Sequence, residues 1–305
     1  MIEVTFIGTG SATPPLGRGN TSFTVRTENM LFLADAGPTV FSDLLRAGIE
    51  PSQIDTVFLS HGHGDHILGF PQLALLGKFS LKDSPLKIFC TSTVREAVCS
   101  VTRLTFPEAS DLLDKFNWME LAEGPRQSHD VIDGVQLTTE LVFGPPYMPV
   151  LGLRLDFIDK GVSLAFSSDT APSDAVASLA NKCDLLIHEA SYSATLQPDI
   201  SPELLFHSDA RQAGQVAARA GVKRLALVHL NRMHGNHRRV LTAEAAESFK
   251  GLILVPDDGD VIQLDKVKRL RCAPFTPRPT SCVRSALGGK RPAMAKENYA
   301  CPHCS

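Results

Sequence analysis

The chain has 305 residues, of which 43% are hydrophobic and 21% are charged, and its formal net charge is −3. This composition is typical of a globular protein and excludes disordered, fibrous and disulfide-scaffold chains. Seven scattered cysteines indicate reduced thiols rather than a disulfide framework. The apolar runs are strand-sized and no signal peptide is apparent, so we expect a cytoplasmic protein that does not enter a membrane.

Short runs rich in β-branched residues predict strands in the following order: Ile2–Ile7, Ser22–Val25, Leu31–Ala34, Thr56–Leu59, Lys87–Phe89, Val135–Phe143, Leu151–Phe157, Val162–Phe166, Leu185–Ile187, Arg224–Val228 and Leu252–Val255. Apolar residues at helical spacing predict helices between them, over Pro38–Ala47, Val94–Arg103, Ser110–Phe116, Ser173–Ala180, Asp209–Ala220 and Leu241–Lys250. The order, with two halves meeting near residue 150, indicates helices packed outside paired sheets.

Charge and periodicity divide the chain near its end. Residues 266–305 hold nine lysines and arginines against one glutamate, which leaves residues 1–265 with a net charge of −11. The apolar pattern stops after Leu264, and the prolines and glycines beyond it show no periodicity. We therefore predict a folded domain over residues 1–264 and a basic, disordered tail over residues 265–305.

Three histidines and one aspartate occur within six residues, directly after the predicted strand Thr56–Leu59. They are His61, His63, Asp65 and His66, and small residues separate them. A sharp turn at the strand end lets these side chains face one cavity. Neutral imidazole and carboxylate are suitable ligands for zinc, manganese and iron. The segment therefore predicts a metal site.

This segment resembles the His-x-His-x-Asp-His signature of the metallo-β-lactamase superfamily. Other motifs are similar to those of the branch that contains ribonuclease Z, the arylsulfatase-like enzymes and related phosphodiesterases; they begin at Ile7, Ala34, Ser167, Ile187, Phe206 and Leu227. The resemblance covers residues 1 to about 264. It implies an α+β fold, the four-layer αββα metallo-β-lactamase sandwich, with metals at one edge.

The resemblance also implies two metal sites, with Zn²⁺ as the expected metal and Mn²⁺ or iron as alternatives. The first site would be formed by His61, His63 and Asp169, and the second by Asp65, His66, Asp169 and His229. One histidine of the family is missing, because Phe143 corresponds to its place. The first site is therefore expected to bind metal more weakly, unless a replacement comes from Glu140, His129, His234 or His237.

Catalytic roles follow from the same resemblance. Glu189 and His207 match a pair that, in this branch, protonates the leaving oxygen. A carboxylate partner raises the basicity of a histidine and fixes its tautomer, which suits a general acid. Asp65 would orient a metal-bound hydroxide, and the site would then act as a metal-dependent hydrolase. The alternative for His207 is a structural role at the start of the helix Asp209–Ala220.

The predicted substrate is a small phosphodiester or sulfate ester. A ribonuclease Z-like nuclease is the alternative; it is disfavoured because His66 and Asp169 are only 103 residues apart, without the long tRNA-binding arm of ribonuclease Z. The acidic domain is also a poor surface for nucleic acid, although the basic tail could bind it. A catalytically degenerate metal-binding module is a third reading, which Phe143 motivates. An iron redox enzyme is disfavoured, since such members use the missing histidine.

Three further expectations concern Asp35, the cysteines of the tail and the oligomeric state. Asp35 is expected to support the metal ligands from the loop after its strand. The tail cysteines Cys272, Cys282, Cys301 and Cys304, with His303, could form a zinc knuckle, against a plain disordered extension. Members of the family are commonly dimers, so a homodimer is one alternative that the sequence itself does not decide.

Overall fold

The structure is a computed structural model, and it describes residues 1–76, 85–124 and 126–264. Within these residues, two mixed sheets of seven strands each face one another. The first sheet contains, in spatial order, β14 (Val261–Gln263), β1 (Glu3–Gly8), β2 (Ser22–Arg26), β3 (Leu31–Ala34), β4 (Thr56–Phe58), β5 (Lys87–Thr91) and β6 (Asn117–Leu121). The second contains β13 (Leu252–Leu254), β12 (Arg224–Val228), β11 (Leu185–Glu189), β10 (Val162–Phe166), β9 (Leu151–Phe157), β8 (Val135–Leu141) and β7 (Gln127–Ile132).

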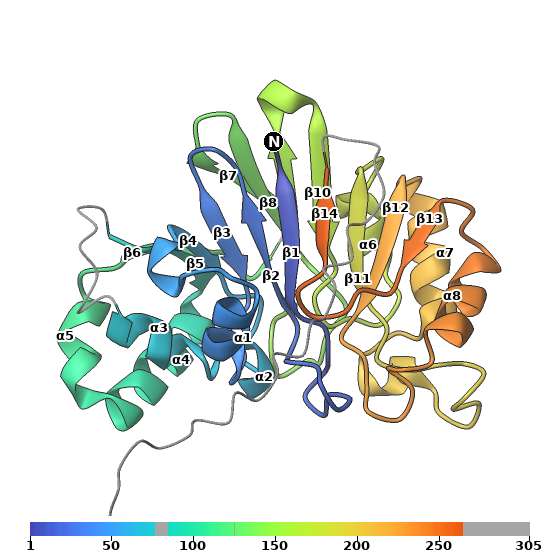
Figure 1. Ribbon diagram of the computed structural model, residues 1–305, viewed down its shortest axis with the longest axis horizontal. Helices are drawn as coiled ribbons and strands as arrows, with labels where there is room; N and C mark the ends of the chain where they lie inside the picture. Colours follow the sequence, from blue (N-terminus) through green and yellow to red (C-terminus); the bar gives the residue numbers. More distant parts are fainter. Residues whose placement is uncertain (77–84, 125, 265–305) are drawn as a thin grey trace, which may run out of the picture. The chain divides into compact units, whose positions relative to one another are not determined.

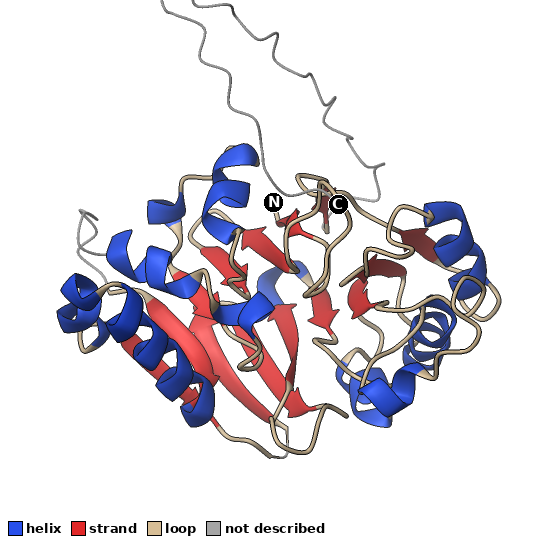
Figure 2. Cartoon of the chain, turned by 90° about the horizontal axis from the view of Figure 1, so that it is seen from below, coloured by secondary structure: helices blue, strands red, loops and turns tan. Residues whose placement is uncertain are grey.

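Helices cover the outer faces of both sheets, so the layers are helix, sheet, sheet and helix (Figures 1 and 2). The first sheet is covered by α1 (Val40–Arg46), α2 (Gly64–Ile67), α3 (Phe70–Leu76), α4 (Ser92–Thr105) and α5 (Ser110–Leu113). The second is covered by α6 (Asp174–Leu179), α7 (Ala210–Ala220) and α8 (Arg238–Ala246). The predicted αββα sandwich is confirmed. No helix in the described part of the chain is long and apolar enough to span a bilayer.

Three apolar cores hold these layers together. The central core lies between the sheets, where Phe23 of β2 meets Phe166 of β10 edge to face, with ring centroids 5.3 Å apart. The other two cores lie between each sheet and its helices. The middle strands are buried on both faces, which explains why they are continuous apolar runs rather than alternating ones.

Local sequence fixes the ends of the helices. The Asp209 side chain accepts a hydrogen bond from the backbone N–H of Gln212, the Gln212 side-chain oxygen accepts one from the backbone N–H of Asp209, and α7 begins there. Gly221, at φ +63°, ends the same helix. Gly214 in the middle of α7 permits close packing, because a Cβ there would lie 2.4 Å from the Ala245 carbonyl oxygen of α8.

The two sheets share a pattern that creates one functional edge. Strands β3 to β6 run parallel in the first sheet, and strands β10 to β13 run parallel in the second. The carboxyl ends of parallel strands meet at one edge of a sheet, where ligand sites of open sheets usually form. The loops after β3, β4, β10, β11 and β12 therefore converge.

The predicted tail, residues 265–305, lies outside the described residues, and so do its cysteines and His303. The boundary at Leu264 stays a prediction. The described domain ends just after β14, which pairs antiparallel with β1.

Candidate metal centre

Four predicted ligands from both halves of the sandwich form one cluster. Asp65, His66, Asp169 and His229 each offer one ligand atom, and these atoms lie within 4.8 Å of one another. The Oδ2 atom of Asp169 is 3.2 Å from Nε2 of His229 and 3.4 Å from Nε2 of His66. We call this set the four-ligand cluster. It is suited to a divalent cation, because it combines two carboxylates with two imidazoles.

A second cluster shares one carboxylate with the first. His61, His63 and Asp169 also bring their ligand atoms within 4.8 Å of one another, and we call them the three-ligand cluster. Nε2 of His61 lies 3.0 Å from Nδ1 of His63 and 3.6 Å from Oδ2 of Asp169. Asp169 is therefore in the predicted bridging place, and every predicted metal ligand lies at this edge.

His66 provides the clearest test of whether a cation fits. Its Nδ1 lies 2.7 Å from Oδ2 of the buried Asp35, so the Nδ1–H group donates to that carboxylate. Its buried Nε2 makes no hydrogen bond and lies 3.4 Å from a carboxylate oxygen of both Asp65 and Asp169, so it faces the cluster and can give its lone pair to a metal ion in place of a proton. An unpaired buried nitrogen is costly, and a metal ion at this point would satisfy it. Asp35 thus supports a ligand, as its place after β3 predicts.

Two serines fix the tautomers of the outer histidines. The Ser60 hydroxyl donates to Asp35 over 2.9 Å, so its oxygen accepts from Nδ1–H of His61 over 3.0 Å. The Ser191 hydroxyl likewise donates to Glu189 over 2.6 Å and accepts from Nδ1–H of His229 over 2.8 Å. Both arrangements leave Nε2 unprotonated and aimed at the cluster.

Electrostatics in the four-ligand cluster favour a positive charge. Burial lowers the pKa of His66, but the carboxylates of Asp169 and Asp35 outweigh it and raise that pKa well above its ordinary value. Burial raises the pKa of Asp169, yet His229 and His66 hold it well below its usual range, and the same two histidines lower the pKa of Asp65. Both carboxyls are therefore ionised at neutral pH, as metal ligands must be.

Beside this cluster lies the predicted proton donor. Nδ1–H of His207 donates to Oε1 of the fully buried Glu189 over 2.9 Å, and the ring stacks on His229 with centroids 5.5 Å apart. Burial lowers the pKa of His207, but Glu189 outweighs it and raises the pKa to about 9. The His207 side chain is 23% exposed, whereas its partner Glu189 is fully buried. The pair has the geometry and the proton of a general acid.

Phe143, which the resemblance sets in the place of the missing histidine, lies just after β8. Its carbonyl accepts from the N–H of Ala171 over 3.0 Å, and its own N–H donates to the Thr170 hydroxyl over 3.2 Å. These contacts tie the loop after β8 to the loop that carries Asp169.

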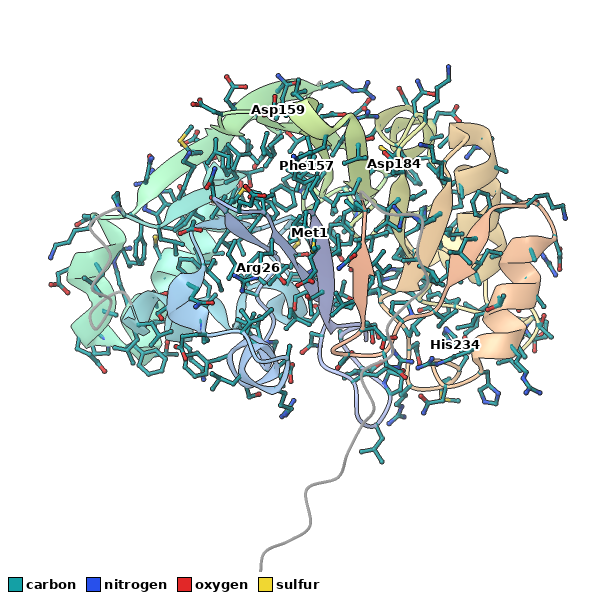
Figure 3. The ribbon with its side chains drawn as sticks, turned by 45° about the horizontal axis from the view of Figure 1, so that its top comes forward. Met1, Arg26, Phe157, Asp159, Asp184 and His234 are labelled. Carbon is teal, nitrogen blue, oxygen red and sulfur yellow. The ribbon has the colours of Figure 1, made fainter. Side chains whose placement is uncertain are left out.

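Among the described residues, none of the four replacement candidates joins a metal-competent group. Glu140 pairs with Arg126, and His129 contacts the ring of Phe89 with centroids 6.1 Å apart. His234 is fully buried and donates through Nε2 to the carbonyl of Ala190, while His237 precedes α8. Figure 3 places His234 at the end of the molecule away from Phe157 and Asp159. The three-ligand cluster therefore has one donor fewer than its neighbour.

The backbone is strained at this edge. Of the described residues other than glycine, five have a positive φ, and four of them are Asp35, Ser168, Phe206 and His229. Left-handed backbone is unfavourable for such side chains and gathers at functional sites. Gly37 is required nearby, since a Cβ there would lie 2.2 Å from the carbonyl oxygen of Asp65.

Sequence reasoning missed two supporting groups. Ser191 follows the segment Ile187-His188-Glu189-Ala190, in the place where the related branch has threonine, so the available signal was a hydroxyl residue in that place. Glu244 of α8 is buried and accepts from the Ser193 hydroxyl and the Thr195 N–H, which fixes the loop that carries Ser191. No spacing in the sequence connects Glu244 to that loop.

Comparisons with known proteins agree with this architecture. A family model described as "Beta-lactamase superfamily domain" matches residues 31–230. A ribonuclease Z of Methanothermobacter thermautotrophicus is 29% identical over 296 positions, which take in 85% of this chain and 95% of the relative.

Two solved structures share the fold. The metallo-β-lactamase fold protein YhfI of Bacillus subtilis has a TM-score of 0.71 at 24% identity and covers 86% of this chain and 100% of its own. The short form of human tRNase Z has a TM-score of 0.69 at 22% identity and covers 86% and 99%. The family match over residues 31–230 shows that the chain belongs to the metallo-β-lactamase superfamily.

Proposed function

We propose that this metal-dependent hydrolase cleaves phosphodiester bonds of RNA, in the manner of a ribonuclease Z. One observation carries the proposal: the Glu189–His207 pair lies directly beside the four-ligand cluster, where His207 stacks on His229. Hydrolysis of an alkyl phosphodiester needs a proton for the leaving oxygen, and this pair can supply one at the metal centre.

The residues divide the work as follows. We propose Asp65, His66, Asp169 and His229 as ligands of one divalent metal, and His61, His63 and Asp169 as ligands of a second, with Zn²⁺ the preferred ion. The bound metal supplies a water that ionises near neutral pH and a positive charge against the phosphoryl oxygens. Asp65 would orient that water for attack, and His207 would donate a proton to the leaving oxygen while Glu189 holds its ring.

The ribonuclease Z relatives support an RNA substrate over the small ester that the sequence favours. A small phosphodiester stays the second candidate because the part of this chain that aligns with the relative is shorter than the matched part of the relative. The match to the Methanothermobacter protein uses 85% of 305 residues, or about 259, out of 296 positions, so roughly 37 positions of the relative have no counterpart here. Between Phe143 and Asp169, the strands β9 and β10 are joined by the tight turn Ile158–Gly161.

Activity on two substrates, each assayed alone, tests the proposal. The full chain, loaded with Zn²⁺ or Mn²⁺, is given a transfer-RNA precursor with a 3′ trailer and, separately, bis(p-nitrophenyl) phosphate. Cleavage of the RNA, with loss of activity in Asp169→Ala together with its metal, is the expected result. Hydrolysis of the small diester alone would replace RNA with the second candidate. Inactivity of the metal-loaded chain on both would overturn the proposal.

A further inference from the structure

Two aromatic side chains lie together beside the proton donor. Phe143 and Phe206 have ring centroids 6.1 Å apart and an interplanar angle of 60°. Phe143 is 55% exposed, although large apolar side chains are usually buried. We call these two residues the aromatic corner.

The corner is fixed to the catalytic groups from both sides. Phe206 immediately precedes His207 and has left-handed backbone, at φ +60°. The backbone of Phe143 is hydrogen-bonded to Thr170 and Ala171, which follow Asp169. Such backbone in a bulky residue is unfavourable, so its presence next to His207 indicates a placed side chain.

The apolar surface continues along the loop that follows Phe143. Tyr147 is 76% exposed on this loop. The side chain of Met148 lies next to Gly62, which stands between the two histidines of the three-ligand cluster. Apolar side chains are thus found both in the loop next to His207 and in the loop next to Gly62.

We propose that the aromatic corner binds a nucleobase of the substrate, an inference that rests on the proposed function. Two rings set at an angle offer one face and one edge to a flat aromatic group, which an alkyl or sugar group cannot match. Bases stack on aromatic side chains with little sequence preference. Stacking would also supply affinity that the charge of the domain does not, because the net charge of −11 over residues 1–265 gives little general attraction to a polyanion.

A base-binding role also accounts for the phenylalanine at position 143, where the family has a histidine. A histidine there would add a metal ligand, whereas phenylalanine adds surface for a base. The three-ligand cluster then binds its metal more weakly, and the corner recognises the base attached to the phosphate.

Binding of two phosphates that differ only in the base tests the inference. Isothermal titration of the metal-loaded full chain compares adenosine 5′-monophosphate with ribose 5-phosphate. We expect the nucleotide to bind about tenfold more tightly, within the range measured for one stacked base. Phe143→Ala and Phe206→Ala should each remove most of that difference without changing the affinity for ribose 5-phosphate. Leu104→Ala, which removes an 83% exposed side chain on α4, is the matched control and should change neither value.

The remaining outcomes each overturn the inference. Equal affinities for the two ligands, or an unchanged ratio in both phenylalanine variants, would leave the phosphate site standing and refute the corner. If neither ligand binds, the corner is refuted as well, while the RNA cleavage assay decides the proposed function separately. If light scattering shows that Phe143→Ala dissociates a dimer while the preference for the nucleotide persists, the corner is an interface between copies of the chain.

Discussion

The hydroxyl oxygen of Ser191 lies 2.8 Å from Nδ1 of His229 and also donates to Glu189, so one serine connects a metal ligand to the partner of the proton donor. Ser191→Ala should lower metal affinity about 10- to 100-fold, as loss of a group that orients a metal ligand commonly does. Ser191→Thr keeps the hydroxyl and should restore most of it. Competition with a chromophoric chelator measures both.

Ser193 offers a matched control two residues further on. Its hydroxyl is buried and donates to Glu244 instead of the site. Ser193→Ala should lower the free energy of unfolding by about 1 kcal/mol and lower metal affinity far less than Ser191→Ala does, because Glu244 still holds the N–H of Thr195. Equal affinities in Ser191→Ala and the wild type would contradict the proposed role of Ser191.

The Glu189–His207 pair predicts a pH dependence of the metal-free protein. Glu189 raises the pKa of His207 to about 9, above the ordinary value of 6.5. A raised histidine pKa means that the stability gained from the pair is fully present below pH 6.5 and is lost as the pH rises through about 9. Titration by NMR should show this pKa, and Glu189→Gln should bring it back towards 6.5. A wild-type value at or below 6.5 would contradict the pairing.

The unequal clusters predict two classes of metal affinity. The four-ligand cluster should fill first, and the three-ligand cluster should lose its ion on dialysis, because it has fewer donors. Elemental analysis should therefore give about two ions per chain with excess metal and about one after dialysis. His63→Ala should abolish only the weaker class. Two equally tight ions would show that another group completes the three-ligand cluster.

Packing of α7 on α8 predicts a cost for a single methyl group. Gly214→Ala would place Cβ 2.4 Å from the Ala245 carbonyl oxygen, so the helices must separate. We expect a loss of about 1–3 kcal/mol of stability, which outweighs the better helix propensity of alanine. Gln215→Ala, on the exposed side of the same helix, is the control. A denaturation midpoint of Gly214→Ala at or above that of the wild type would contradict this contact.

Much of the fold could be predicted from the sequence because the central strands are apolar throughout. Leu31–Ala34, Leu151–Phe157, Val162–Phe166 and Arg224–Val228 match their observed bounds. The edge strand β7 was missed, since Gln127–Ile132 is largely polar and half exposed. The helix α3 was missed as well, because its seven residues are apolar on most sides and contain Pro71, which hides a helical period.

The site, like the fold, has one part that the sequence predicts and another that it does not. Local motifs located each predicted ligand, since His61 to His66 are held by one turn and Asp169, Glu189 and His229 each lie at a strand end. The contacts made through Ser191, Glu244 and Phe206 join segments that are distant in the chain, and the packing of the second sheet with its loops and helices brings them together. The sequence offers several polar residues in place of the missing histidine, but within the described residues none of them joins the three-ligand cluster.

The role of His207 is the central claim, and the dependence of its effect on the leaving group tests it most directly. Metal-loaded wild type and His207→Ala are compared on an RNA phosphodiester and on bis(p-nitrophenyl) phosphate, whose leaving group departs without a proton. We predict a loss of about 10²- to 10⁴-fold on the RNA, little loss on the activated diester, and unchanged metal content. An equal loss on both substrates, with metal retained, would contradict the assignment of His207 as the proton donor.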